Sequence, residues 1–187
     1  MSSSVWMYGD GNSTEVFDAL DTIPLNVDLI DKTRPQTSPY LMHETGAGPG
    51  FITEDLDWNS GTPPDIVIIG YAASALSLWF VTFGQFMEEW AFFEAASIVR
   101  AADRFRDLGS RVLLSIGPGI PRADPRSEAL EWAVRIVEGY TTQTRYPHVN
   151  WGLDRDNLDL WQDGVHPSPE GAAIIALRIA STLELLV

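Results

Sequence analysis

An aspartate and a histidine stand three residues apart near the end of the chain, in the stretch WQDGVHPSPEGA (161–172). Gly164 and Pro167 place Asp163 and His166 in a short loop, and the sequence after them has the pattern of a helix. A carboxylate beside an imidazole fixes the tautomer of the ring and stabilises the imidazolium ion that forms when the ring takes a proton. The pair is therefore a candidate general base.

A second stretch of interest, WMYGDGNST (6–14), lies near the start of the chain. It follows an apolar run and leads into helical sequence, where an α/β hydrolytic fold carries its nucleophile. The residue after Gly-Asp is Gly11, which has no side chain and cannot attack a substrate. Asn12 is a candidate ligand-binding residue. Ser13 either caps a helix that begins near Thr14–Glu15 or acts as a displaced nucleophile.

The string DGVHPSPEGA (163–172) resembles, almost letter for letter, the last conserved block of the SGNH (GDSL-type) hydrolases. The resemblance extends, with declining quality, over nearly the whole chain. It implies a single SGNH-hydrolase-like domain over residues 1–187, with a flavodoxin-like arrangement of strands. In such a domain Asp163 and His166 would be catalytic.

The resemblance also aligns the first block of the family, Gly-Asp-Ser, with Gly9, Asp10 and Gly11. In the family the serine supplies both the attacking hydroxyl and a backbone N–H that binds the oxyanion. Gly11 would keep the N–H and lack the hydroxyl. Asp10 would serve as a hydrogen-bond acceptor that holds the loop.

The two middle blocks of the resemblance supply the rest of the oxyanion hole. The glycine of one block falls on Gly50, or alternatively Gly48, in TGAGPG. The asparagine of the other block is replaced by Ser74 in AASA (72–75). A serine can also donate one hydrogen bond, but its side chain is shorter than that of asparagine. Losing one oxyanion donor costs about 10²–10³ in rate. The resemblance therefore implies the fold, whereas it does not imply ester hydrolysis.

Strand-like and helix-like segments alternate along the chain. Strands are expected at 4–8, 25–31, 64–72, 111–118 and 149–153, and helices from Thr14–Glu15 and over 79–108, 125–144 and 168–187, with Ser127 and Ser168 as N-caps and a Gly/Pro-rich loop at 43–51. This alternation predicts an α/β fold of three layers, a doubly wound parallel sheet of about five strands with helices on both faces. Ligands of such folds bind at the carboxyl ends of the strands.

Composition excludes several classes of function. The chain has 26 acidic and 12 basic residues and a net charge of −14, whereas nucleic-acid binders need the opposite sign. The absence of cysteine excludes disulfides and thiolate metal sites. Neither a signal peptide nor a membrane span is indicated, so a cytoplasmic protein without a membrane partner is expected. The sequence carries no metal-ligand or cofactor motif, and we expect neither group.

An aromatic stretch, LWFVTFGQFMEEWAFF, occupies residues 78–93. Its large apolar residues recur at spacings of three and four and form one helical face, which consists of Trp79, Phe80, Phe83, Phe86, Met87 and Trp90. Phe92 and Phe93 add apolar surface beyond that face. The stretch is expected to pack in the core, to cover the active site, or to bind a partner protein or a second copy through Trp79, Phe83, Phe86 and Trp90.

Three functions are compatible with these residues. The first is an enzyme, for example of biosynthesis, in which His166 and Asp163 deprotonate a small-molecule substrate that supplies its own nucleophile, as in a cyclisation or a transfer. The second is an esterase or acyl transferase that uses Ser13. The third is a non-catalytic binding or scaffold subunit. The complete DGVHP block favours an enzyme, and the missing hydroxyl at Gly11 favours the first function.

Overall fold

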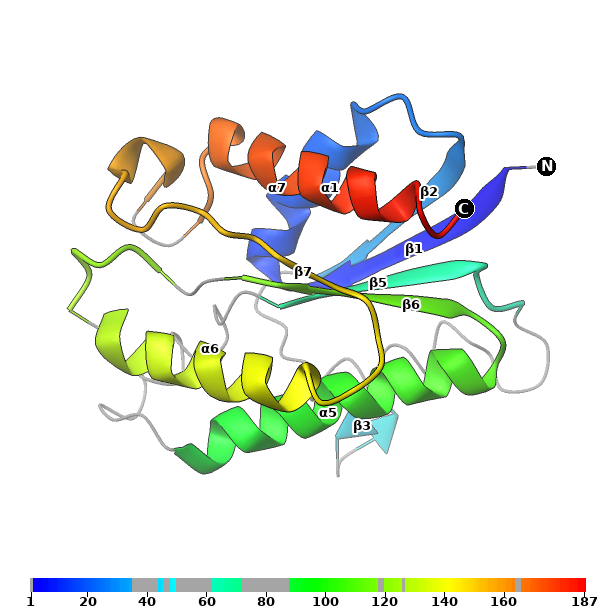
Figure 1. Cartoon of the computed structure of the whole chain (residues 1–187), viewed down its shortest axis with the longest axis horizontal. Helices are drawn as coiled ribbons and strands as arrows, with labels where there is room; N and C mark the ends of the chain where they lie inside the picture. The colour runs from blue at the N-terminus through cyan, green and yellow to red at the C-terminus, as the bar shows by residue number, and fades with distance from the viewer. Residues whose placement is uncertain are drawn as a thin grey trace.

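A five-stranded parallel sheet forms the centre of the molecule (Figure 1). The computed structural model describes residues 2–34, 44–45, 48–49, 62–71, 88–117, 120–125, 127–163 and 166–187. The strands are β1 (Ser3–Gly9), β2 (Val27–Thr33), β5 (Ile66–Tyr71), β6 (Arg111–Ile116) and β7 (His148–Asn150). Their order is β2-β1-β5-β6-β7, and all neighbouring pairs are parallel. This confirms the predicted doubly wound α/β fold.

The inner strands are apolar because the sheet is covered on both faces. All residues of β5, the run IVIIGY, are buried. In the register of β1 and β5, Val5 pairs with Ile66 and Tyr8 with Ile69. At the edge of the sheet, β2 alternates between half-buried and exposed residues over its first four positions. A continuous apolar run therefore marks a central strand here, and alternation marks the edge strand.

In the described part of the chain, helices cover both faces of the sheet (Figure 1). On one face α1 (Gly11–Asp21) packs against α7 (Pro169–Leu183), and on the other α5 (Glu88–Asp107) packs against α6 (Ser127–Thr141). Successive residues of β1 contribute to the two cores. Met7 belongs to the cluster on the α1 and α7 side, and Tyr8 to the cluster on the α5 and α6 side. The predicted three layers are thus present.

The later helices differ from prediction mainly at their ends. Ser168 caps α7 as predicted, because its Oγ accepts from the N–H of Gly171 at 3.2 Å. Ser127 is the first residue of α6 rather than its N-cap, so that prediction is wrong. Its side chain is buried and accepts a hydrogen bond from Arg155 instead. A tertiary contact has replaced the local one.

Two other predictions are met only in part. The helix predicted over 79–108 is present from Glu88 onward, and residues 79–87 lie outside the described residues. Within the predicted loop 43–51, β3 (Glu44–Thr45) and β4 (Gly48–Pro49) form a short antiparallel pair. The rest of that loop is not described.

All five parallel strands end on the same side of the sheet, which we call the carboxyl edge (left in Figure 1). The turn from β1 into α1 lies at this edge, and so does the segment that leads into α7. The fold therefore brings the two candidate stretches of the sequence to one side of the molecule.

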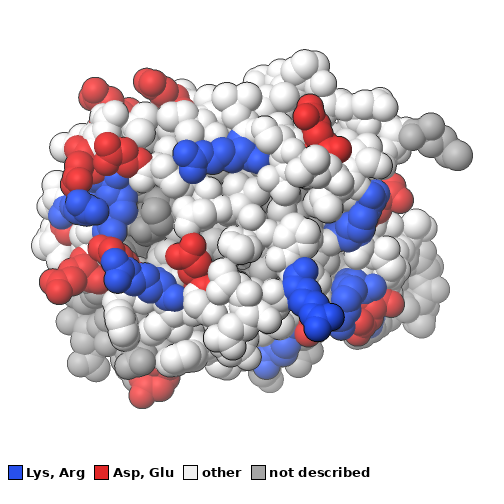
Figure 2. All heavy atoms as spheres, viewed as in Figure 1, with Lys and Arg blue, Asp and Glu red and all other residues white. Residues whose placement is uncertain are grey.

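Charges of both signs are spread over the face of the molecule that Figure 2 shows. Exposed ion pairs join Arg122 to Asp156 at 2.8 Å and Arg135 to Glu131 at 2.6 Å. Within the described ranges, none of the helices has the length and apolar character needed to cross a membrane.

Candidate active site

Asp163 and His166 are in direct contact. The Nδ1 atom of His166 lies 2.8 Å and 3.1 Å from the two carboxylate oxygens of Asp163. A carboxylate only accepts hydrogen bonds, so Nδ1 carries the proton and Nε2 is left as the basic nitrogen. The His166 side chain is 35% exposed. The pair can therefore take a proton from a bound molecule.

Backbone hydrogen bonds close the turn that carries this pair. The N–H of Gln162 donates to the carbonyl of His166 at 2.8 Å, and Trp161 forms a β-bridge with Pro167. The N–H of His166 donates to Asp163 Oδ1 at 2.9 Å. Asp163 thus holds both the backbone and the ring of His166, which explains the three-residue spacing.

The turn also rests closely on the helix that follows it. The N–H of Ser168 donates to the carbonyl of Leu160, the last residue of the 3₁₀ helix η1 (Leu158–Leu160). A Cβ on Gly171 would overlap the same carbonyl oxygen. Gly171 is therefore a glycine because the backbone of the turn passes against the first turn of α7.

The turn between β1 and α1 differs from the sequence prediction. α1 begins at Gly11 rather than near Thr14–Glu15, and Asp10 is its N-cap. Asp10 Oδ1 accepts from the backbone N–H of Ser13 at 3.3 Å and from its Oγ at 3.2 Å. Asp10 therefore holds the loop as predicted, and the prediction that Ser13 is the N-cap is wrong. A carboxylate at an N-cap is favoured by the helix dipole as well.

The Ser13 side chain lies in an enclosed position. It has no exposed surface. A Cβ on Gly9 would overlap its Cβ and Oγ, and a Cβ on Gly70 would meet its Oγ. The two glycines, at the end of β1 and near the end of β5, thus make the space that the serine fills. In this arrangement the hydroxyl donates to Asp10 and is not presented to a substrate.

Gly11 and Asn12 occupy the same turn with different exposure. Asn12 is fully buried, so in this structure its amide does not face solvent. Gly11 is partly exposed and is the first residue of α1. The first N–H groups of a helix have no acceptor within the helix, and the helix dipole favours an anion there. The backbone N–H of Gly11 therefore stays the candidate oxyanion donor that the resemblance implies.

The remaining predicted residues of the oxyanion hole, Gly50 and Ser74, lie outside the described residues. Trp79, Phe83 and Phe86 of the aromatic face lie outside them too. Trp90 is half-buried, packs against the core and contacts Phe93 edge-on, with ring centroids 6.2 Å apart. The contacts of Trp90 agree with packing in the core. The partner interface expected for the aromatic face stays a prediction.

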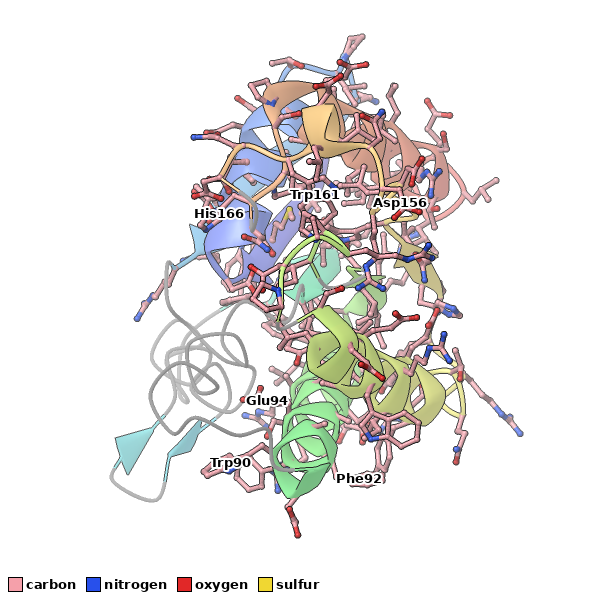
Figure 3. The ribbon with its side chains drawn as sticks, turned by 90° about the vertical axis from the view of Figure 1, so that its left-hand side faces the viewer. Trp90, Phe92, Glu94, Asp156, Trp161 and His166 are labelled. Carbon is pink, nitrogen blue, oxygen red and sulfur yellow. The ribbon has the colours of Figure 1, made fainter. Side chains whose placement is uncertain are left out.

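Sequence reasoning missed two buried polar residues near the carboxyl edge, Tyr71 at the end of β5 and Glu94 on α5. They are 1% and 2% exposed. Burial raises the pKa of Tyr71 well above its ordinary value of 10.0, and the charges of Glu94 and Asp10 raise it further. The phenol therefore stays protonated. Figure 3, which looks onto the carboxyl edge, shows His166 in the upper layer and Glu94 below it on α5.

A signal for Glu94 exists in the sequence. Ala91 and Ile98, three residues before it and four after it, are both buried on α5. An acidic residue on the apolar face of a helix is a candidate for a buried polar role. In the described ranges, no three His, Asp or Glu side chains are grouped so that they could hold a metal ion.

Comparison with known proteins supports the fold. No protein-family model matches the sequence, and no curated protein matches it. Among solved structures, a GDSL-like lipase from Bacteroides thetaiotaomicron is similar, with a TM-score of 0.66, 20% identity, and 99% of this chain and 89% of that chain covered. This chain has the SGNH-hydrolase fold.

Two further structures with the SGNH fold illustrate the same similarity. An aryl esterase from M. smegmatis covers 100% of both chains, with a TM-score of 0.69 and 13% identity. An acetyl xylan esterase covers 96% of this chain and 99% of its own, with a TM-score of 0.71 and 15% identity. The predicted resemblance is thus confirmed at the level of the fold.

Proposed function

We propose that this chain is an enzyme with an SGNH scaffold in which the Asp163–His166 pair acts as a general base and the substrate supplies the nucleophile. The reaction is an intramolecular displacement, such as a cyclisation, or a transfer with loss of an anionic leaving group. The observation that carries the proposal is the double contact of Asp163 with Nδ1 of His166, which leaves Nε2 as the proton acceptor.

The proton and the electron pairs balance within the substrate and the base. A hydroxyl or amine of the substrate gives its proton to Nε2 of His166, and its oxygen or nitrogen bonds to an electrophilic carbon. The leaving group departs with the electron pair of its bond. The imidazolium then returns the proton to the leaving group. The N–H of Gly11, at the start of α1, would stabilise the negative charge that develops.

Ser13 would be the nucleophile of the alternative, an esterase or acyl transferase. The similar structures named as esterases favour this reaction. The enclosed hydroxyl of Ser13 opposes it, because the hydrogen bond to Asp10 would have to break before any attack. A binding subunit without catalysis, which docks a partner through the aromatic face, is the third candidate.

A fluorophosphonate probe, which labels activated serines, separates these functions. The protein mass is measured after incubation for the wild type, Ser13→Ala, Gly11→Ser and Gly11→Ser/His166→Gln. Among the described glycines, only Gly109 and Gly152 have a positive φ. A serine at position 11 therefore causes no backbone strain. We expect no adduct on the wild type, one on Gly11→Ser, and none when His166→Gln is added.

Other outcomes contradict the proposal in distinct ways. An adduct on the wild type that is lost in Ser13→Ala would identify a displaced nucleophile. Absence of labelling in Gly11→Ser would show that no working base lies beside position 11, and would favour the binding subunit.

A further inference from the structure

Hydrogen bonds made by two buried side chains, Trp161 and Arg155, connect the turn of His166 to α6, on the other face of the sheet. Trp161 is 6% exposed. The backbone of Trp161 pairs with Pro167, the residue after His166. Its indole N–H donates to the carbonyl of Asp154 at 3.2 Å. In Figure 3, Trp161 lies between His166 and the loop of Asp156.

Arg155 holds the loop next to that carbonyl. It is 8% exposed, and its guanidinium donates to the carbonyl of Ile120 at 2.7 Å and to both oxygens of Ser127. It also forms an ion pair with Glu131 at 2.7 Å. Its own carbonyl accepts from the backbone N–H of Arg122 at 3.1 Å. A buried cation with this many partners holds its backbone in one place.

The position of the His166 ring depends on these hydrogen bonds for a geometric reason. The side chain of Asp163 is 54% exposed, so solvent competes for the hydrogen bond that orients the ring. The base of the turn is held by the bridge at Trp161, and the indole ring is the part of the turn that reaches into the core. A shift of Trp161 would therefore move Asp163 relative to His166 and weaken the hydrogen bond between them.

We propose that Trp161 is a positioning residue of the Asp163–His166 base, and that Arg155 supports it by fixing the carbonyl of Asp154. This inference rests on the proposed function for its catalytic meaning. The hydrogen bonds from Trp161 and Arg155 set the distance between Nε2 and the substrate, and a misplacement of about 1 Å can cost about 10²-fold in rate.

The test combines two readouts on Trp161→Phe, which keeps an aromatic ring in the core and removes the N–H donor together with part of the volume of the indole. The first is the rate of fluorophosphonate labelling in the Gly11→Ser background, which we expect to fall about 10-fold. The second is the ¹⁵N NMR signal of the His166 ring at neutral pH, assigned with His166→Gln. We expect a single Nδ1–H tautomer in the parent and a mixture of tautomers in Trp161→Phe.

Arg155→Lys keeps the charge and removes the multiple contacts of the guanidinium. We expect a change in the same direction in both readouts, of about 3-fold in rate. Trp132→Phe is the matched control, because Trp132 lies on α6 and is 53% exposed. It should change neither readout. Thermal unfolding of each variant checks that the protein is folded at the temperature of the measurement.

Each outcome decides the inference. An unchanged tautomer and labelling rate in Trp161→Phe would overturn it, and so would equal changes in Trp132→Phe. An effect of Trp161→Phe without one of Arg155→Lys would overturn the role of Arg155. If Gly11→Ser is not labelled at all, the proposed function fails, and the NMR signal still decides whether Trp161 orients His166.

Discussion

Each of two turns at the carboxyl edge contains an aspartate that accepts hydrogen bonds from the residue three positions later. The two pairs differ in their exposure to solvent. Asp163 accepts from the backbone N–H and the side chain of His166, three residues later. Asp10 accepts from the backbone N–H and the side chain of Ser13, also three residues later. The first pair is partly exposed, whereas the second is 1% and 0% exposed.

The difference shows that burial, rather than local hydrogen bonding, separates a group available for chemistry from one that only stabilises the fold. His166 presents a basic nitrogen outside its turn. The hydroxyl of Ser13 is closed in by the glycines of β1 and β5. In these two described turns His166 is thus a candidate base and Ser13 is not presented as a nucleophile, which is the arrangement that the proposed function requires.

The largest predicted effect concerns the exposed turn. Asp163→Asn, in the Gly11→Ser background, should lower the labelling rate by about 10³–10⁴-fold, because an amide does not hold the Nδ1–H tautomer or stabilise the imidazolium. Asp156→Asn, in an exposed ion pair, is the control and should change the rate less than about 2-fold. A loss below about 10-fold in Asp163→Asn would show that the carboxylate does not set the state of His166.

The next effect tests how closely the exposed turn rests on α7. Gly171→Ala should lower the free energy of unfolding by about 1–3 kcal/mol, because its Cβ would overlap the Leu160 carbonyl. Gly139→Ala on α6 meets no atom within 4 Å and should raise it by about 0.5–1 kcal/mol. Urea unfolding measures both. If both variants changed the free energy of unfolding in the same direction, the close contact between Gly171 and the Leu160 carbonyl would be contradicted.

Ser13→Ala tests the enclosed turn. Removing a buried hydroxyl that donates to Asp10 should cost about 1 kcal/mol of unfolding free energy. The labelling rate of Gly11→Ser should not change. Ser181→Ala, an exposed serine on α7, is the matched control and should stay within about 0.5 kcal/mol of wild type. A fall in labelling with Ser13→Ala would show that its hydroxyl takes part in the chemistry.

The smallest effect concerns the support of the exposed turn. Hydrogen bonds from Arg155 first, and from Arg135 second, hold the pKa of Glu131 below its ordinary value of 4.5. Its ionised form therefore adds stability that is present above that value and is lost as the pH falls through the lower pKa of the folded state. The gain should stay below about 1 kcal/mol, because the side chain is 33% exposed.

The measurement is the difference in melting temperature between wild type and Glu131→Gln as a function of pH. It should shrink from about pH 5 to about pH 3. A constant difference over that range would mean that the ion pair with Arg155 does not stabilise the fold.

Much of the fold could be predicted because its signals are local. β5 is a continuous apolar run, Ser168 precedes a helix and accepts from its first turn, and Asp163 reaches His166 across three residues. The start of α1 was mispredicted because Asp10 and Ser13 are both good N-caps, and only the position of the strand end selects between them. Gly50, Ser74 and the wider aromatic face stay predictions.

The sequence by itself determined the order of the elements, the apolar strands and the pairing of Asp163 with His166, since each depends on neighbours a few residues apart. Only the tertiary structure decided that Ser13 is enclosed, because Gly9 and Gly70 come from two different strands. The contacts of Trp161 and Arg155 were decided there as well. Hydrogen bonds between separate loops follow from how the layers pack, and the spacing of residues along the chain does not show which loops meet.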